Sequence, residues 1–407
     1  MRHTQSTLSG KDVCAYATGM LLAALAGIGW VTGAATVDPL LLVQLLVRAG
    51  AERRSLEAIA LLAQNAPCAG TIRNALAKLL PKTTAELEPV IVKALHRRLP
   101  KSLACRPRTM AIDFHNKPFY GDKRTPGTYR SQPKASTKTF FAYATLLSIR
   151  KGQTYTVALA PVVNSDELTS VIDQLLRQAA QIGLRPRRLL LDRGFYAAKV
   201  MLHLQEKNIP FVMPMIRRGK SAATKAGCTG TAQFFVKGRS GWAKYRWQAR
   251  IRTGGRKGPK GPRTAVTTDV CMVPRPDKKG QKKAKSTPWV YACHGMNRMP
   301  GNEVAALYRR RFRIETSYRQ MHEGLAMTCS KDPVYRLLLV LIAFVLRNLW
   351  VWLHWTLFAG RTKGGQRVLR LHLMRARRML HCLVRYLDYK LGIPKNIVIP
   401  NPAAAAA

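Results

Sequence analysis

The chain has 407 residues, enough for roughly two or three domains with sizeable apolar cores. It carries 68 Lys and Arg residues against 20 Asp and Glu residues, a formal net charge of +48. A compact fold with this excess repels itself unless it meets a polyanion, so we expect nucleic acid as the partner, with an anionic membrane surface as the alternative. Because the basic residues are spread along the whole chain, the composition excludes a neutral protein with one basic tail.

The eight cysteines follow no C-x-x-C spacing, which indicates neither a zinc site nor a disulfide framework. We therefore expect reduced thiols in a cytoplasmic protein, and the polar first residues predict no signal peptide. Two apolar stretches, 19–35 and 337–360, are candidates for membrane helices. Glycines interrupt the first, and Arg347 and His354 fall inside the second, where polar and charged groups are costly in lipid. We interpret both stretches as core helices and expect no membrane association.

Residues 11–100 are rich in leucine and alanine and are broken by glycines and prolines, which predicts a set of helices. Within them, 55–64 and 70–80 flank a break at 65–67 and resemble a helix-turn-helix, with Ser55 as the N-cap of the first helix. An ordinary helical hairpin fits the same pattern. If the motif reads DNA, the side chains that face it from the second helix are Thr71, Arg73, Asn74 and Lys78.

From about residue 107 the pattern changes to alternating and apolar runs that are typical of strands. A polar connection, 115–133, follows the first strand, and helices are predicted at 165–182 and 196–207. The order β-β-β-α-β-α-β is that of a ribonuclease H-like core, so the expected fold class is α/β with a mixed sheet. The expected strands are 108–114, 138–149, 154–163, 189–192 and 210–216.

The stretch 217–298 breaks this rhythm, because short β-like runs alternate with very basic loops. We interpret it as a β-rich insertion whose loops contact phosphates. The runs are 232–236, 242–251, 265–273 and 288–293, and the loops are 217–220, 254–263 and 278–285. A basic amphipathic helix over 303–324, an apolar helix over 337–357 and an arginine-rich helical tail over 361–385 follow. The expected domains are an all-α N-terminal domain (1–105), the first part of the core (106–216), the insertion (217–298), the second part of the core (299–360) and the basic tail (361–407).

Two acidic residues end predicted strands of the core. Asp113 follows the apolar run 110–112, and Asp192 follows three leucines at 189–191. Because these strands are neighbours in a ribonuclease H-like sheet, the two carboxylates would lie side by side, and a divalent metal would relieve their repulsion. The alternative for Asp192 is a cap on the helix that begins near residue 196.

A third acid, Glu315, shares a helical face with basic and aromatic residues. Tyr308, Arg311, Glu315 and His322 are spaced three, four and seven residues apart, which brings them to one side of a helix. Taken alone, an acid among arginines is more simply a salt-bridged surface glutamate. Beside two aspartates at one sheet edge, Glu315 becomes the natural third metal ligand.

These residues resemble the Asp-Asp-Glu signature of the DDE transposases of bacterial and archaeal insertion sequences. The matching motifs are Asp113 in AIDF, Asp192 in LLLDRGF and Glu315 in YxxRxxxE, in the family's order and with a β-rich insertion in the second gap. The resemblance implies cut-and-paste transposition, in which the ends of an element are cleaved and joined to target DNA by in-line phosphoryl transfer. It also implies that the three acids bind two Mg²⁺ ions, with Mn²⁺ as a substitute.

The resemblance further implies how DNA is held. Tyr308 and Arg311 would position the scissile strand, and Arg193, Arg319 and His322 would make further DNA contacts. The N-terminal helices would read the terminal inverted repeats, and the insertion would clamp flanking DNA. Because transposition joins two ends, we expect a homodimer on DNA and a nucleoid-associated location. One departure is that this chain has His322 where the family's fuller signature has a lysine, and histidine donates to phosphate only weakly near neutral pH.

Two other functions fit the same sequence. A transposase impaired by the histidine would act only as a DNA-binding protein. A metal-dependent nuclease on the same core would hydrolyse DNA without joining strands.

Overall fold

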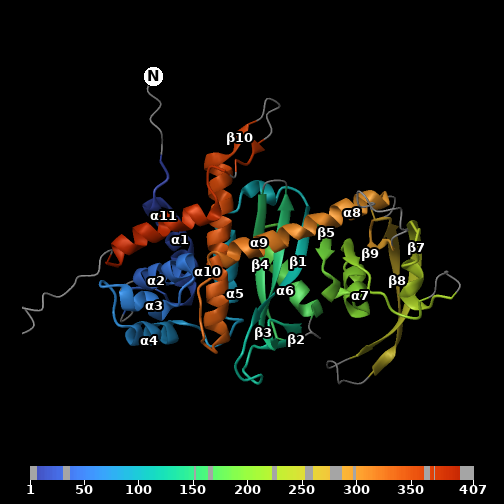
Figure 1. Ribbon diagram of the computed structural model, residues 1–407, viewed down its shortest axis with the longest axis horizontal. Coiled ribbons are helices and arrows are strands. Elements are labelled where there is room, and N and C mark those ends of the chain that lie inside the picture. Colours follow the sequence, from blue (N-terminus) through green and yellow to red (C-terminus); the bar gives the residue numbers. More distant parts are fainter. Residues whose placement is uncertain are drawn as a thin grey trace, which may run out of the picture. The chain divides into compact units, whose positions relative to one another are not determined.

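The computed structural model of the chain separates into two compact units, Met1–Arg98 with Arg319–Ala407, and Leu99–Tyr318 (Figure 1). The N-terminal and C-terminal helices, which the sequence assigned to separate domains, share the first unit because α1 packs against α11. The described residues are 7–30, 37–150, 153–163, 168–221, 227–252, 260–275, 287–296, 299–361, 367–370 and 372–394. The expected loop 278–285 lies outside these residues, as do parts of the expected loop 254–263, the start of the expected helix 165–182 and the end of the tail.

The first unit is built around α10, which packs against α1, α2, α5 and α11. Figure 1 shows α10 as the long vertical helix of this unit. A short antiparallel pair, β10 (Gly360–Arg361) and β11 (Arg367–Val368), follows it. The helices are α1 (Gly10–Leu25), α2 (Pro39–Glu52), α3 (Leu56–Leu62), α4 (Ala69–Leu79), α5 (Glu88–His96), α10 (Pro333–Leu353) and α11 (Ala376–Lys390).

Two helical stretches of this unit, Gly10–Ile28 and Pro333–Phe358, are long and apolar enough to cross a membrane. In the second stretch, 94% of the most apolar window is buried inside the protein, and in the first the share is 44%. Arg347 is only 4% exposed within α10, and its Nε lies 3.4 Å from the side-chain oxygen of Gln320. The burial of α10 is that of a core helix, as the sequence predicted.

Side-chain caps fix where several of these helices begin. Ser9 and Asp12 form a reciprocal capping box at the start of α1. Ser55 accepts a hydrogen bond from the Ala58 N–H at 3.1 Å, so the predicted N-cap of α3 is confirmed. Asp332 caps α10 in the same way, with Pro333 at the first helical position.

The second unit is built on one mixed sheet of nine described strands. The strand order is β2-β3-β1-β5-β6-β9-β8-β7, and β4 pairs with β3. The helix α6 packs on β3 and β4, and α7 packs on β7 and β8. The helices are α6 (Leu168–Ala180), α7 (Ala198–Glu206), α8 (Gly301–Arg309) and α9 (Arg313–His322), the last of which continues into the first unit. The strands are β1 (Arg108–Pro118), β2 (Tyr129–Lys134), β3 (Thr137–Arg150), β4 (Gln153–Val162), β5 (Pro186–Leu191), β6 (Phe211–Pro214), β7 (Gly241–Arg252), β8 (Lys260–Val273) and β9 (Trp289–His294).

The central strand β1 is antiparallel to β3 and parallel to β5. In the parallel pair, Ile112 lies opposite Leu191, the residue directly before Asp192. The predicted neighbourhood of the two strands that carry the aspartates is therefore confirmed, although Asp113 lies within β1 and does not end it. Both strands are fully buried at this point, which explains their continuous apolar runs.

Four local expectations were wrong. The tail is not one helix over 361–385, because β10 and β11 stand at its start and α11 covers only Ala376–Lys390. The stretch 115–133 is not only a connection, because β1 continues to Pro118 and β2 begins at Tyr129. Residues 232–236 form no strand; a 3₁₀ turn, Gly230–Phe234, stands there. The expected continuous helix over 303–324 is interrupted by a 3₁₀ turn, Arg310–Phe312, between α8 and α9.

The strands of the insertion extend the sheet of the core. β6 pairs with β9, β9 with β8 and β8 with β7, so the insertion begins and ends on adjacent strands. β7 is the outermost strand, and the side chains of Lys244, Arg246 and Arg250 are exposed along it. Their alternate spacing brings all three to one face of the strand.

A buried ion-pair cluster ties α2 to α11 within the first unit. Arg48 of α2 is 2% exposed. Its Nη1 lies 2.6 Å from Glu52 Oε2, and its Nε lies 2.7 Å from Asp388 Oδ1 on α11. Because a buried guanidinium without partners is costly, these two carboxylates determine whether Arg48 can be tolerated there.

Replacing Arg48 by Met removes the buried cation, so Asp388 loses its pair with Arg48 and Glu52 keeps only its contact with Arg54 at 3.4 Å. We expect the free energy of unfolding to fall by about 2 kcal/mol, less than for a fully buried pair because the carboxylates are partly exposed. Denaturant unfolding measures the loss. The matched control is Arg97→Met at the exposed end of α5, which should stay within about 0.5 kcal/mol of wild type. Equal effects in both variants would contradict a role for the cluster.

Candidate active site

Two aspartates reach the same edge of the sheet from neighbouring strands. Asp113 lies in β1, and Asp192 directly follows Leu191 at the end of the parallel strand β5. Beyond them, the rings of Phe114 and Phe195 stack with centroids 4.6 Å apart and planes inclined by 11°. This contact fixes the turn after Asp192 against β1. Ligands of α/β sheets gather at this edge, outside the carboxyl ends of the strands.

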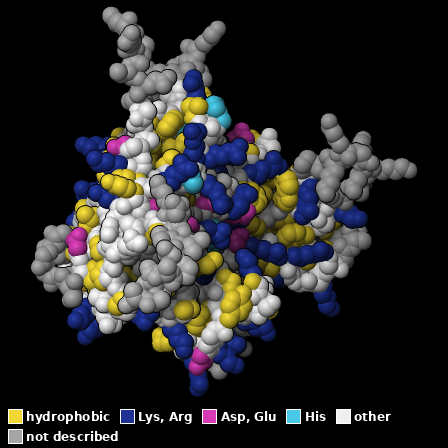
Figure 2. All heavy atoms as spheres, turned by 60° about the vertical axis from the view of Figure 1, so that its left-hand side comes forward, with side chains coloured by type: hydrophobic (Ala, Val, Ile, Leu, Met, Phe, Trp, Pro, Cys, Tyr) yellow, Lys and Arg dark blue, Asp and Glu magenta, His cyan; other side chains and the backbone are white. Residues whose placement is uncertain are grey.

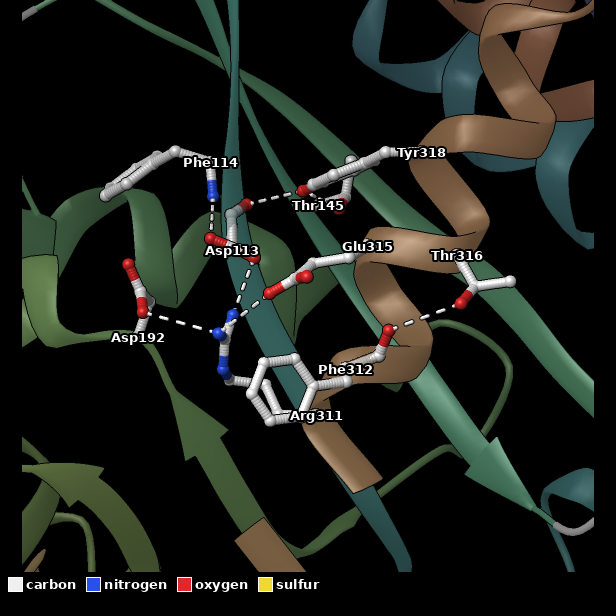
Figure 3. A network of polar contacts seen from close by, with 9 residues as sticks. All are labelled: Asp113, Phe114, Thr145, Asp192, Arg311, Phe312, Glu315, Thr316 and Tyr318. Carbon is white, nitrogen blue, oxygen red and sulfur yellow. Dashed lines mark hydrogen bonds and ion pairs between the residues drawn. The ribbon is translucent and has the colours of Figure 1, made fainter. Parts of the chain in front are cut away.

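The third acid arrives from α9 together with an arginine from the preceding 3₁₀ turn (Figure 3). Arg311 Nη1 lies 2.7 Å from Asp113 Oδ2, and its Nη2 lies 3.1 Å from Glu315 Oε1 and 3.5 Å from Asp192 Oδ1. The structure thus gathers all three predicted acids around one guanidinium. The side chain of Arg311 is 7% exposed, whereas that of Glu315 is 50% exposed.

Tyr318 holds the strand that carries the first acid. Its hydroxyl donates to the backbone carbonyl of Asp113 at 2.9 Å and lies 2.7 Å from Thr145 Oγ1 of β3. The Asp113 carboxylate also accepts the N–H of Phe114 at 2.8 Å. Tyr318 was missed in the sequence, although its spacing from Arg311 and Glu315 continues the same helical face.

Burial dominates the electrostatics of the site. Burial raises the pKa of Asp113 to about 6, even though the charge of Arg311 lowers it; Asp192 raises it further. For Arg311 the balance is reversed: burial lowers its pKa, but Tyr308 and the carboxylates together raise it above the ordinary value. The guanidinium is therefore charged, and Asp113 exchanges its proton close to neutral pH.

The structure bears on the simpler interpretations, in which Asp192 caps a helix and Glu315 is a salt-bridged surface residue. Asp192 precedes a 3₁₀ turn, Arg193–Phe195, without a side-chain cap, and α7 has Ala197 at its N-cap. The alternative role of Asp192 as a helix cap is therefore wrong. Glu315 is half-exposed and salt-bridged, as the alternative for it required, but its partner Arg311 also binds Asp113.

The other predicted DNA-contacting residues lie in several places. The ring of Tyr308 lies 5.6 Å from the Arg311 guanidinium carbon, and Tyr308 and the exposed Arg193 line a cavity of about 450 Å³. Arg73, Asn74 and Lys78 are exposed on α4. Arg319 is exposed and His322 half-buried on the part of α9 that belongs to the first unit.

The cavity was not predicted. Aromatic and basic side chains line it from β9, α8 and the turn after α8, and its wall includes Trp289, Tyr291, Arg309 and Phe312. The guanidinium of Arg309 stacks over Trp289 at 5.0 Å, and Phe312 is 51% exposed. These residues are far apart in sequence, so no local pattern marks them.

The donor set suits a hard divalent cation, because carboxylate oxygens are the ligands that Mg²⁺ prefers. The three acids already converge on one positive group, the guanidinium of Arg311. Within the described part of the chain, no three His, Cys, Asp or Glu side chains lie close enough to share one ion. Because Arg311 pairs with all three carboxylates, a metal at this site would compete with its guanidinium for them.

Residues 108–349 match the protein family described as the transposase DDE domain. The match covers more than half of the chain and contains Asp113, Asp192 and Glu315. The chain therefore belongs to the transposase DDE domain family, and it is a transposase enzyme.

The fold is similar to that of a piggyBac transposase, seen by cryo-EM in a synaptic complex with hairpin DNA. The TM-score is 0.51 at 10% sequence identity, and the alignment covers 99% of this chain and 89% of that chain. At this identity the similarity concerns the fold, a large mixed sheet with helices. No curated protein sequence matches the chain.

The raised pKa of Asp113 predicts a pH-dependent stability. Because the pKa is about 6 in the folded protein and 3.8 ordinarily, the folded state holds this proton more tightly. The protonation of Asp113 therefore contributes its full stabilisation of the folded state below about pH 4, and this contribution is lost as the pH rises through about 6. Relative to Asp113→Asn, wild type should lose about 3 kcal/mol of unfolding free energy between these limits. Denaturant unfolding in metal-free buffer measures both, and parallel curves would contradict the assignment.

Proposed function

We propose that this transposase catalyses metal-dependent cut-and-paste transposition of a bacterial or archaeal insertion sequence. The observation that carries the proposal is the convergence of Asp113, Asp192 and Glu315 at one sheet edge. The strand order β4-β3-β1-β5-β6 supports a ribonuclease H-like core, in which such acids serve phosphoryl transfer.

Asp113, Asp192 and Glu315 would hold two Mg²⁺ ions, or Mn²⁺ in their place, which activate the attacking oxygen and stabilise the leaving oxygen. The chain's own contribution is positional. Asp113 loses its proton near neutral pH and becomes a full ligand. Tyr318 fixes its backbone, and the Phe114–Phe195 stack fixes the turn that carries Asp192.

DNA is the proposed partner, as terminal inverted repeats and as target. The net charge of +48 requires a polyanion, and on the face shown in Figure 2 the Lys and Arg side chains far outnumber the acidic ones. We also propose a homodimer on DNA, because two ends must be joined, and a nucleoid-associated place in the cytoplasm. Tyr308, Arg311 and Arg193 are the proposed contacts to the scissile strand, with Arg319 and His322 beyond them on α9.

A second candidate is a transposase that binds its ends without processing them. His322, at the position of the family's lysine, favours this alternative because an imidazole is a weaker partner for phosphate than the ammonium group of lysine. An assay of DNA cleavage and joining separates this candidate from the catalytically active transposase.

The test is Mg²⁺- or Mn²⁺-dependent cleavage and joining of DNA that carries the element's own terminal repeats. We expect Asp113→Asn, Asp192→Asn and Glu315→Gln each to lower the rate by a factor of roughly 10³ or more while DNA binding survives. The matched control is Glu303→Gln, an exposed acid in the first turn of α8.

Each result has a distinct meaning. Cleavage that persists in Glu315→Gln would make this residue only a salt-bridge partner. Hydrolysis without joined products would point to a nuclease. Binding without cleavage in wild type would favour the second candidate, and His322→Lys would then be the variant expected to restore cleavage.

We also propose that α4 reads the terminal repeat, with Arg73, Asn74 and Lys78 exposed toward DNA. Arg73→Gln with Lys78→Gln should weaken binding to the repeats roughly ten-fold and reduce the salt dependence by about two charges. Lys93→Gln with Arg97→Gln, which changes two exposed cations of α5, is the control. Equal losses in a gel-shift titration would favour an ordinary helical hairpin.

A further inference from the structure

Arg311 occupies the point at which the three acids converge. It pairs with all of them at 2.7, 3.1 and 3.5 Å, and its side chain is 7% exposed. The three acids therefore share one guanidinium at the point where they converge.

A guanidinium and a metal ion compete for the same carboxylate oxygens. The Oδ2 of Asp113 already accepts a hydrogen bond from Arg311 at 2.7 Å, and Oε1 of Glu315 accepts one at 3.1 Å. A divalent ion in contact with these oxygens would also lie within a few ångströms of the guanidinium charge, which is strongly unfavourable. Binding of the ion is therefore opposed as long as Arg311 stays in place.

We propose that Arg311 is an internal counter-ion that closes the carboxylate site until DNA draws it away. This inference rests on the proposed function, in which the three acids hold metal. In this exchange the metal ion binds the carboxylates, and a DNA phosphate binds the displaced guanidinium. Arginine suits the contact with phosphate, because its planar fork binds phosphate with two hydrogen bonds.

The surroundings of Arg311 give it a route out of the site. It stands in the 3₁₀ turn between α8 and α9, where the backbone is less rigidly bonded than within a helix. Its guanidinium carbon lies 5.6 Å from the ring of Tyr308 and 5.4 Å from that of Phe312. Because Phe312 is 51% exposed, the guanidinium can move toward solvent and keep an aromatic contact.

The exchange makes metal and DNA binding interdependent. Without DNA, the metal must displace Arg311 into water, so its affinity is reduced. With a phosphate in reach, the displaced guanidinium gains a partner, and the affinity for metal rises. By thermodynamic reciprocity the metal must raise the affinity for DNA by the same factor, which keeps the site from loading metal when no DNA is bound.

The test measures Mn²⁺ binding directly, from the free-ion signal in electron paramagnetic resonance, with the full chain and no DNA. Arg311→Met should bind Mn²⁺ roughly five- to 150-fold more tightly than wild type, the usual range for coupled sites. The matched control is Arg310→Met, which removes an exposed charge from the same turn and should match wild type. The double variant Asp192→Asn with Arg311→Met should lose the gain.

The second arm adds a short 5′-phosphorylated duplex, with Mn²⁺ bound by the duplex alone subtracted. Wild type should then gain affinity for Mn²⁺, and Arg311→Met should gain little more. Arg311→Lys covers the case in which the methionine variant fails to fold, because it keeps the charge but not the planar fork. Without DNA, the Mn²⁺ affinity of Arg311→Lys should lie between that of DNA-free wild type and that of wild type bound to the duplex.

The failures of the two proposals are distinguishable. Equal Mn²⁺ affinity in wild type, Arg311→Met and Arg310→Met would overturn the counter-ion role but leave the metal site intact. An equal gain of Mn²⁺ affinity in Arg311→Met and Arg310→Met would show that the loss of any positive charge has this effect. That result would also overturn the counter-ion role. Absence of Mn²⁺ binding in every variant, with and without duplex, would overturn the metal site and with it the proposed function.

Discussion

A carboxylate buried within a central strand needs a positive partner, and the second unit is arranged to supply one. Asp113 is 9% exposed beside a second acid, a position that is tolerated only if a cation compensates it. The turn after α8 brings Arg311 to that point, and the following helix adds both Glu315 and the hydroxyl of Tyr318. The strand β1, the turn after α8 and the helix α9 are thus held together by contacts with the buried residue Asp113.

The parts of this site that follow from sequence are the ones that local spacing or strand order determines. Asp113 and Asp192 end apolar runs on strands that had to be adjacent, and Arg311 and Glu315 are one helical turn apart. The central position of the guanidinium could not be predicted, because it depends on how α8 and α9 meet the sheet. The aromatic cavity beside it gathers Trp289 and other residues that are remote in the chain.

The errors in secondary structure have similar causes. The sequence predicts a connection where β2 stands, because the side chains of β2 are mostly exposed and polar and lack the apolar alternation that marks a strand. Residues 232–236 are apolar, but a run this short packs equally well as a 3₁₀ turn. The break at Arg310–Phe312 leaves the helical periodicity almost unchanged, which is why one continuous helix was expected.

The extension of the core sheet by the insertion makes β7 an edge strand among the strands that the structure describes. An edge strand of 12 residues is a template to which another extended chain could bond. Lys244, Arg246 and Arg250, which stand exposed along it, make a second copy of the same edge electrostatically repellent. The charge that suits this protein to a polyanion therefore also protects it from self-association and aggregation, a protection that a bound polyanion or high salt would weaken.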